Sequence, residues 1–137
     1  MRKVELGPAI VEVEGDTVFL NRQSAWTAEN VGGFLALLEQ LRAEHGHVFS
    51  ISDLSEGLSV SPDARKRITD WNRTKTLDAV VLVKATIAAR AVITLLFRGA
   101  QLVSGRNSPF YFASSREEAV AIIARERTRL KMATAGS

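Results

Sequence analysis

The sequence predicts an α/β domain, in which four helices cover a mixed, mostly parallel sheet with an N-terminal β-hairpin edge. Two runs of alternating apolar residues flank Gly15-Asp16, which is the pattern of a two-residue hairpin. Strand-length apolar runs then alternate with segments that begin with helix-capping residues, as in β-α-β units. Residues 79–83 are apolar throughout, as expected for a central strand buried on both faces.

Each expected element follows from local signals. Thr27, Ser61, Thr86 and Ser115 can each cap a helix that starts at the next residue. Gly46 ends the first helix, and Gly32-Gly33 within it favours a close approach to the sheet. In chain order, the elements are a hairpin over 11–20, a helix from 28 to about 44, a strand over 48–54, a helix from 62 to about 75, a strand over 79–83, a helix from 87 to about 103, a strand over 110–112 and a helix from 116 to about 130.

Length and composition favour one domain. The chain has 137 residues, of which 46% are hydrophobic and 24% charged, enough for one core. We expect a single domain over 1–130 and a disordered tail over 131–137. With zero cysteines, disulfides, thiolate zinc sites and cysteine nucleophiles are excluded. The N-terminus lacks the apolar core of a secretory signal, so we expect a cytoplasmic protein.

Charge is distributed unevenly along the chain. Residues 1–60 hold 4 Lys/Arg against 9 Asp/Glu, whereas residues 61–137 hold 14 against 6. A basic half can attract phosphate, anionic lipid or an acidic partner, although arginines also simply solvate helix faces. The basic helix over 62–75 lacks interleaved exposed aromatic residues and carries Asp63 and Asp70, so we expect no nucleic-acid binding.

No motif of a known catalytic type is present. His45 and His47 are the only histidines, and their position near a predicted helix end favours interaction with the helix dipole. The sequence contains no Gly-x-Ser-x-Gly, HExxH, P-loop or GxGxxG pattern. We therefore expect no catalytic residue, no metal and no cofactor.

Polar residues gather where the predicted parallel strands end, which is where open α/β sheets bind ligands. Two helix N-termini, at Ser61 and Thr86, could hold an anion between them. Alternatively, both residues are ordinary caps, and Asp53 forms a structural ion pair with Lys84. The candidate ligand- or partner-binding residues are Asp53, Ser55, Ser59, Ser61, Arg65, Lys84, Thr86 and Arg90.

The helix from residue 87 is apolar on more than one face. Its polar residues form one narrow stripe of Arg90, Thr94, Arg98 and Gln101. The second apolar face could meet a neighbouring helix, a second subunit or an apolar ligand. We expect a homodimer with Ile93, Leu96 and Phe97 at its interface. A transmembrane helix is not expected, because Arg90 and Arg98 interrupt every stretch of membrane-spanning length.

Asp53-Leu54-Ser55 at a strand end and the helix start Ser61-Pro62-Asp63-Ala64-Arg65, in this element order, resemble STAS-like proteins over about residues 4–128. More narrowly, the chain resembles the SpoIIAA-like family, which shares its fold with anti-sigma-factor antagonists. The resemblance implies a non-catalytic role in binding or regulation. STAS antagonists carry a phosphorylated serine in an Asp-Ser-x-Gly-Leu element. Here the loop over 56–60 lacks that element, so neither Ser59 nor Ser61 is assigned as the acceptor.

These observations lead to one main functional hypothesis and two alternatives. We expect a non-enzymatic, homodimeric regulatory module that contacts a protein partner through the loop and helix from Asp53 to Arg65. The alternative is a carrier of a lipid-like anion, with the third helix lining the groove and Lys84 or Arg90 holding the head group. An enzyme with Asp53 and Lys84 as its acid-base pair is the third hypothesis.

Overall fold

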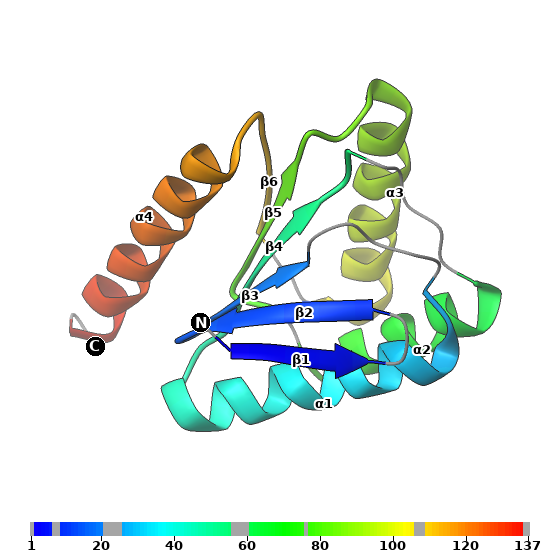
Figure 1. Cartoon of the computed structure of the whole chain (residues 1–137), viewed down its shortest axis with the longest axis horizontal. Coiled ribbons are helices and arrows are strands. Elements are labelled where there is room, and N and C mark those ends of the chain that lie inside the picture. Colours follow the sequence, from blue (N-terminus) through cyan, green and yellow to red (C-terminus); the bar gives the residue numbers. More distant parts are fainter. Residues whose placement is uncertain are drawn as a thin grey trace.

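The computed structural model describes residues 2–6, 9–20, 26–55, 61–75, 77–105 and 109–135. A six-stranded mixed sheet with four helices confirms the predicted α/β fold (Figure 1). The elements are β1 (Arg2–Leu6), β2 (Ala9–Glu14), β3 (Thr17–Leu20), α1 (Ala28–His45), β4 (Phe49–Asp53), α2 (Pro62–Asn72), β5 (Ala79–Val83), α3 (Ile87–Ser104), β6 (Phe110–Ala113) and α4 (Arg116–Ala135).

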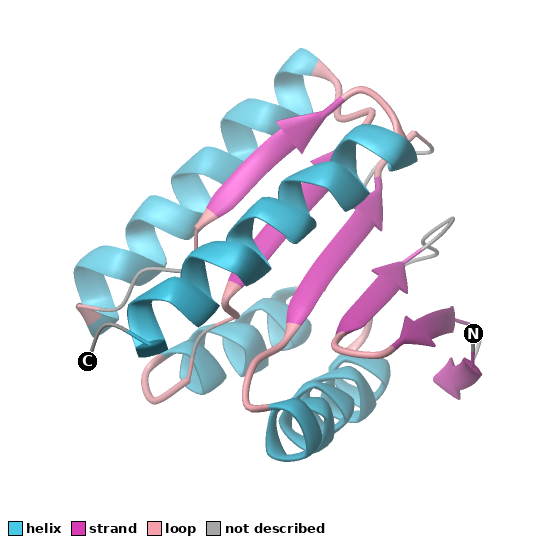
Figure 2. Ribbon diagram, turned by 90° about the vertical axis from the view of Figure 1, so that its left-hand side faces the viewer, coloured by secondary structure: helices cyan, strands magenta, loops and turns pink. Residues whose placement is uncertain are grey.

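The strands lie side by side in chain order, from β1 to β6. β1, β2 and β3 form an antiparallel meander, and β3 to β6 are parallel. Each crossover helix connects neighbouring parallel strands in the same direction, and right-handed connections place all such helices on one face. Accordingly, α1, α2 and α3 cover one face of the sheet. α4 follows the last strand and therefore is not a crossover helix; it covers the other face (Figures 1 and 2).

Three apolar clusters fill the space between the sheet and its helices. Val11, Val18 and Leu38 belong to the first, where β2 and β3 meet α1. A second cluster joins β5 to α3 through Leu82 and Ile93. The third lies on the opposite face, where β3, β4 and β5 pack against α4. The strands are buried on both faces only where α4 is present, which explains the continuous apolar run of β5.

The caps act as the sequence predicted. The hydroxyls of Thr27, Ser61 and Thr86 accept hydrogen bonds from the third residues of α1, α2 and α3. Ser115 accepts one from the Glu118 amide at 3.1 Å. The carboxylate of Glu118 accepts hydrogen bonds from the amide and the hydroxyl of Ser114. These bonds hold the pKa of Glu118 below its usual value.

The two glycines inside α1 make room for other elements, as expected, but in two different ways. A Cβ on Gly33 would lie 2.9 Å from a methyl of Leu6 on β1, so Gly33 permits the close approach to the sheet. A Cβ on Gly32 would meet the guanidinium of Arg67, which donates to the Ala28 carbonyl at 2.9 Å. Gly32 therefore serves the packing of α2 on α1.

Two segments differ from the prediction. The sequence predicts no strand before residue 11, yet β1 forms the first edge of the sheet and β2 begins at Ala9. Three of the five β1 residues are charged and exposed, so the apolar signal of a strand is weak there. At the other end, α4 continues to Ala135, so residues 131–135, predicted as tail, are helical.

Candidate functional site

The carboxyl ends of the parallel strands gather several of the predicted site residues at one edge, which we call the carboxyl edge. Asp53 ends β4, and Lys84 follows β5 directly. Main-chain hydrogen bonds continue the ladder here, from the Leu54 amide to Val83 and from the Lys84 amide to Ala113. Parallel pairing thus brings Asp53 and Lys84 to the same edge although they are far apart in sequence.

Asp53 and Ser61 bound the loop between β4 and α2. The Asp53 carboxylate accepts a hydrogen bond from the Ser55 amide at 2.9 Å, which shapes the turn after the strand. Ser61 caps α2, with its hydroxyl 3.1 Å from the Ala64 amide. Arg65 lies exposed in the first turns of α2. Ser59 lies outside the described residues.

Lys84 has a left-handed backbone conformation, with φ of 58°, which residues other than glycine rarely adopt. Its side chain is exposed. Thr86 caps α3 through a 3.1 Å bond from the Ala89 amide. Arg90 is held in place, because its Nε donates to the Ala85 carbonyl at 3.2 Å and its guanidinium lies 5.1 Å from the Phe112 ring centre. The capping role of Thr86 and Ser61 agrees with the simpler of the two interpretations.

α3 divides its apolar residues between the core and the exterior. Ile93 is buried against the sheet, and Phe97 stacks on Phe110 with ring centres 4.8 Å apart. These two predicted interface residues therefore pack within the chain itself. Leu96, the third, is 44% exposed. The prediction of a second apolar face is thus correct, but most of its residues are others.

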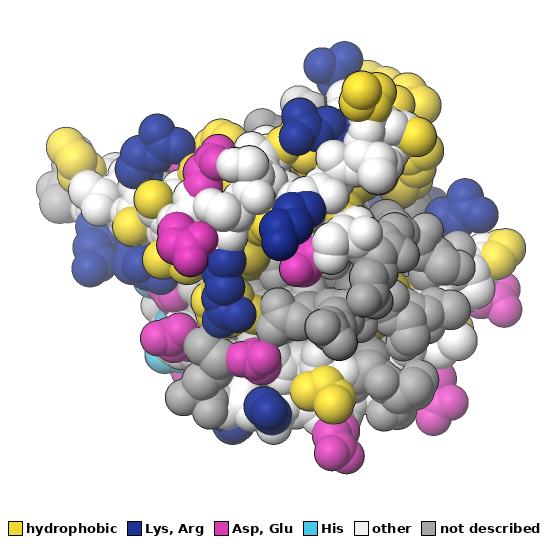
Figure 3. Space-filling view, turned by 45° about the horizontal axis from the view of Figure 1, so that its top comes forward, with side chains coloured by type: hydrophobic (Ala, Val, Ile, Leu, Met, Phe, Trp, Pro, Cys, Tyr) yellow, Lys and Arg dark blue, Asp and Glu magenta, His cyan; other side chains and the backbone are white. Residues whose placement is uncertain are grey.

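α3 exposes a set of large apolar side chains, which we call the α3 ridge. It consists of Ile87, Val92, Leu95, Leu96 and Leu102. Leu95 is 72% exposed and Leu102 is 88% exposed. Figure 3 shows hydrophobic side chains gathered over α3, with Lys and Arg side chains beside them. Exposed apolar side chains that gather on one element are typical of interaction sites in proteins.

The charges around the α3 ridge are all of one sign on α3 itself. This helix contains Arg90 and Arg98 and neither Asp nor Glu. The neighbouring helix α2 exposes Arg65 and Lys66, together with Asp63. The ridge is therefore bordered mainly by cations, as expected from the basic second half of the chain.

The sequence patterns do not indicate a buried ionic cluster that lies at the end of the parallel strands opposite the carboxyl edge. Asp16, in the hairpin turn, accepts two hydrogen bonds from Arg127 of α4, at 2.7 and 2.8 Å. Thr17 and His47 also contact its carboxylate, at 2.8 and 2.6 Å. Burial by itself raises the pKa of Asp16, but the hydrogen bonds from Arg127, Thr17 and His47 outweigh it and hold the pKa well below the usual range.

This cluster joins three distant segments, since Asp16 and Arg127 are 111 positions apart. Arg127 and His47 also pack on the ring of Phe49, 5.5 and 5.3 Å from its centre. In the sequence, Asp16 has the pattern of a turn residue and His47 lies near a predicted helix end, so no local pattern links the two residues. The arrangement holds the hairpin, β4 and α4 together, which is a structural role.

A second polar cluster lies under α4. The Tyr111 hydroxyl donates to Glu126, and Arg129 donates to the same carboxylate at 2.8 Å. The hydrogen bond to Glu126 raises the pKa of Tyr111. Burial by itself raises the pKa of Glu126. The hydrogen bonds from Tyr111 and Arg129 outweigh burial, so the pKa of Glu126 lies below its usual value. The cluster attaches α4 to β6.

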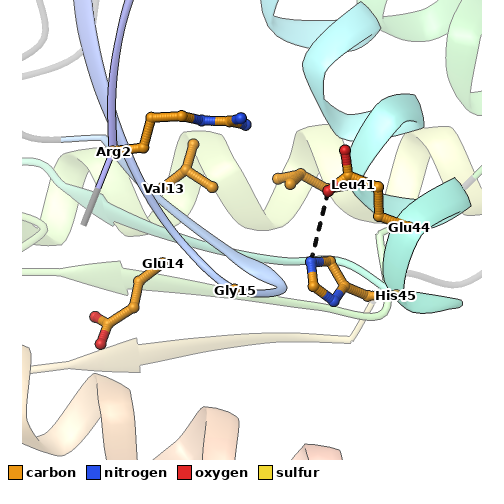
Figure 4. Close-up of a pocket in the computed structure, with 7 residues that line it drawn as sticks. All are labelled: Arg2, Val13, Glu14, Gly15, Leu41, Glu44 and His45. Carbon is orange, nitrogen blue, oxygen red and sulfur yellow. Dashed lines mark ion pairs between the residues drawn. The ribbon is translucent and has the colours of Figure 1, made fainter.

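An open hollow lies between the hairpin and the end of α1, far from the carboxyl edge. Arg2 points into it, Glu14 points away, and His45 lies 3.8 Å from Glu44 (Figure 4). Within the described residues, no cluster of three or more His, Asp or Glu side chains could hold a metal ion. We assign this hollow no role.

No helix in the described part of the chain is long and apolar enough to cross a membrane. No family model matches this chain, and no curated protein matches it either. The resemblance to STAS-like proteins therefore stays a prediction from the residues.

Proposed function

We propose that this protein is a non-enzymatic interaction module that binds a regulatory protein partner through the α3 ridge and the adjoining carboxyl edge. The exposed α3 ridge is the observation that carries this proposal. Five of the eight large apolar residues that lie exposed within the described chain belong to this one helix. Burying each such side chain in a complex would contribute about 1.5–3 kcal/mol if it were fully covered.

The position of the ridge extends the predicted contact region. Thr86, at the carboxyl edge, is the cap of α3, so the ridge begins where Asp53 and Lys84 lie. A partner seated on α3 can therefore also reach the start of α2 at Ser61 and Arg65, since α2 and α3 are neighbours. The proposed surface includes the two described ends of the region that the sequence indicated, residues 53–55 and 61–65, with α3 as its apolar part.

The charges define the chemistry of the partner. Arg98 on α3 and Lys84 at its start are exposed, and α3 offers no acidic side chain in return. Apolar burial supplies most of the affinity, while charge complementarity sets orientation and specificity. We infer a partner surface that presents apolar side chains bordered by Asp and Glu.

The alternative of a lipid-anion carrier is less well supported by the packing. A groove between α3 and the sheet would have to occupy the space that Ile93, Phe97 and Phe110 fill. The apolar side chains that remain for a ligand point outward. A surface contact with a protein uses them as they stand.

A photo-crosslinking amino acid at Leu95 tests the proposal, with Val120 as the matched control position. Val120 is 46% exposed on α4, which covers the opposite face of the sheet. We expect the Leu95 probe, and not the Val120 probe, to capture one protein in cells. That protein, once identified and purified, should bind the wild-type chain with an affinity that Leu95→Glu weakens by roughly tenfold or more and Val120→Glu leaves unchanged.

Three outcomes would contradict this assignment. Equal binding by Leu95→Glu and wild type would place the contact elsewhere. Capture of a second copy alone would make α3 a dimer interface. Binding of the purified chain to phospholipid vesicles, lost in Leu95→Glu, would instead support the lipid alternative.

A further inference from the structure

We propose that β1 is a self-association edge, at which two copies of this chain pair their β1 strands antiparallel about a two-fold axis at Val4. This inference moves the interface of the homodimer expected from the sequence from Ile93, Leu96 and Phe97 of α3 to β1. β1 is an edge strand of the sheet, and no described segment lies beyond it (Figure 2). Its outer main-chain groups are therefore available for a partner strand.

The hairpin geometry determines which β1 residues direct their main-chain groups outward. A two-residue turn joins β2 to β3, and its closing pair, Glu14 and Thr17, is of the hydrogen-bonded type. Hydrogen-bonded and non-bonded pairs alternate along an antiparallel ladder. In β2, Glu12 and Glu14 thus bond to β3, while Val11 and Val13 bond to β1.

The same alternation then applies to β1. Arg2 faces Val13 and Val4 faces Val11, so these two β1 residues use their main-chain groups toward β2. Lys3 and Glu5 must direct theirs outward. When two β1 strands pair about Val4, Lys3 stands opposite Glu5 of the second copy and forms a hydrogen-bonded pair with it, twice by symmetry.

The side chains at these positions are complementary in charge. Lys3 and Glu5 are both exposed, and they lie on the same face of the sheet because they are two residues apart. On its own chain Lys3 is paired with Glu12 of β2, so in the dimer it would lie between two carboxylates. Opposite charges that face each other across strands are favourable, and like charges are unfavourable.

Other registers are excluded by the same two requirements. A two-fold axis at Lys3 would place two lysines opposite each other, and an axis at Glu5 would place two glutamates together. A shift by one residue would oppose outward and inward main-chain groups. A lysine on an edge strand normally prevents pairing, but here Glu5 occupies the position that neutralises it.

The other sheet edge lacks this self-complementarity. β6 has the sequence Phe-Tyr-Phe-Ala and carries no charged residue. Its aromatic side chains already serve the two layers of helices, because Phe110 stacks on Phe97 of α3 and Tyr111 bonds to Glu126 of α4. β1 is therefore the edge with a defined register for a second copy.

Charge exchange at the two positions tests the proposal, with oligomeric state measured by light scattering and native mass spectrometry over a series of concentrations. We expect wild type to dimerise. Lys3→Glu and Glu5→Lys should each weaken the dimer by roughly tenfold or more, since each makes both cross-strand pairs like-charged. Lys66→Glu makes the same charge change on α2 and should leave the dimer intact.

The decisive sample is an equimolar mixture of the two single variants. One variant then presents a glutamate at both positions and the other a lysine at both, so each cross-strand pair of the mixed dimer joins opposite charges. The mixture should therefore form a heterodimer, although neither variant dimerises by itself. Thermal unfolding of each variant verifies that it is folded, and Glu5→Lys keeps the Lys3 contact with Glu12. A monomeric wild type, or a mixture that stays monomeric, would overturn the proposal.

The α3 variant separates this inference from the proposed function. Leu95→Glu should remain a dimer while it loses its partner protein. A dimer that dissociates in Leu95→Glu and persists in Lys3→Glu would place self-association at α3 and overturn the assignment to β1.

Discussion

At the scale of single residues, Asp16 shows how a turn residue becomes a tertiary anchor. Its side chain is 9% exposed, and its carboxylate receives hydrogen bonds from Arg127, Thr17 and His47. A charge in such a position is stable only while its partners remain, because burial would otherwise favour the neutral form. The hairpin, β4 and α4 therefore depend on one another through this group.

Asp16→Asn should lower the free energy of unfolding by about 2–4 kcal/mol at neutral pH, because the Arg127 guanidinium loses its anionic acceptor. Urea denaturation measures the loss. Glu14→Gln, which neutralises an exposed acid in the same hairpin, should change stability by no more than about 0.5 kcal/mol. Equal effects of the two variants would contradict the role assigned to Asp16.

The lowered pKa of Asp16 also predicts a pH dependence. The folded-state pKa lies below the unfolded value of about 3.9, so the folded state favours the ionised form. Its contribution is fully present above the unfolded pKa and is lost as the pH falls through the folded one. In acid, wild type should lose more stability than Asp16→Asn. Parallel profiles for the two proteins would count against this expectation.

Thr86 tests one of the two interpretations of the carboxyl edge, which are an anion-binding site between two helix N-termini and a pair of ordinary helix caps. As the cap of α3, its hydroxyl accepts from the Ala89 amide, so Thr86→Ala should lower stability by about 1 kcal/mol. Thr69→Ala, at an exposed position inside α2, is the control and should change stability by less than about 0.5 kcal/mol. If thermal unfolding is unchanged in Thr86→Ala, the capping role fails.

At the scale of elements, α3 carries a core face and a recognition face on one helix. Ile93 lies in the core, whereas Leu95, two residues later, is on the outside. Periodicity alone shows that α3 is apolar over most of its circumference. Only the position of the sheet determines which of the two residues is buried.

The division predicts opposite effects of truncation. Ile93→Ala should lower the free energy of unfolding by about 2–5 kcal/mol, since it removes buried methyl groups and leaves a cavity. Leu95→Ala should change it by less than about 0.5 kcal/mol and weaken partner binding instead. Chemical denaturation separates the two. A large loss in Leu95→Ala would show that the ridge is covered within the chain.

At the scale of the whole molecule, ion pairs between the acidic first half and the basic second half of the chain partly balance the uneven charge of the sequence. Asp16 and Glu39, in the acidic first half, pair with Arg127 and Lys75 of the basic second half. α4, with its basic residues, covers the opposite face of the sheet from α2 and α3. The charge asymmetry therefore does not translate into one basic surface, and only the α2 and α3 side adjoins the exposed ridge.

The sequence by itself determined the sheet type and the order of the elements from β2 onward. Caps such as Thr27 and Ser61 are local signals, because a side chain that bonds three residues ahead needs no tertiary context. The same holds for the hairpin at Gly15-Asp16 and for the apolar run of β5. Convergence of Asp53 and Lys84 at the carboxyl edge also followed, since parallel pairing brings strand ends together.

Only the tertiary structure decided what lies between segments distant in sequence. The contact of Asp16 with Arg127, the burial of Ile93 and the exposure of Leu95 depend on where α3 and α4 pack against the sheet. β1 has too few apolar residues to be recognised locally, and it is a strand because β2 offers it a hydrogen-bonded edge. Local patterns select elements, whereas their partners are selected by packing.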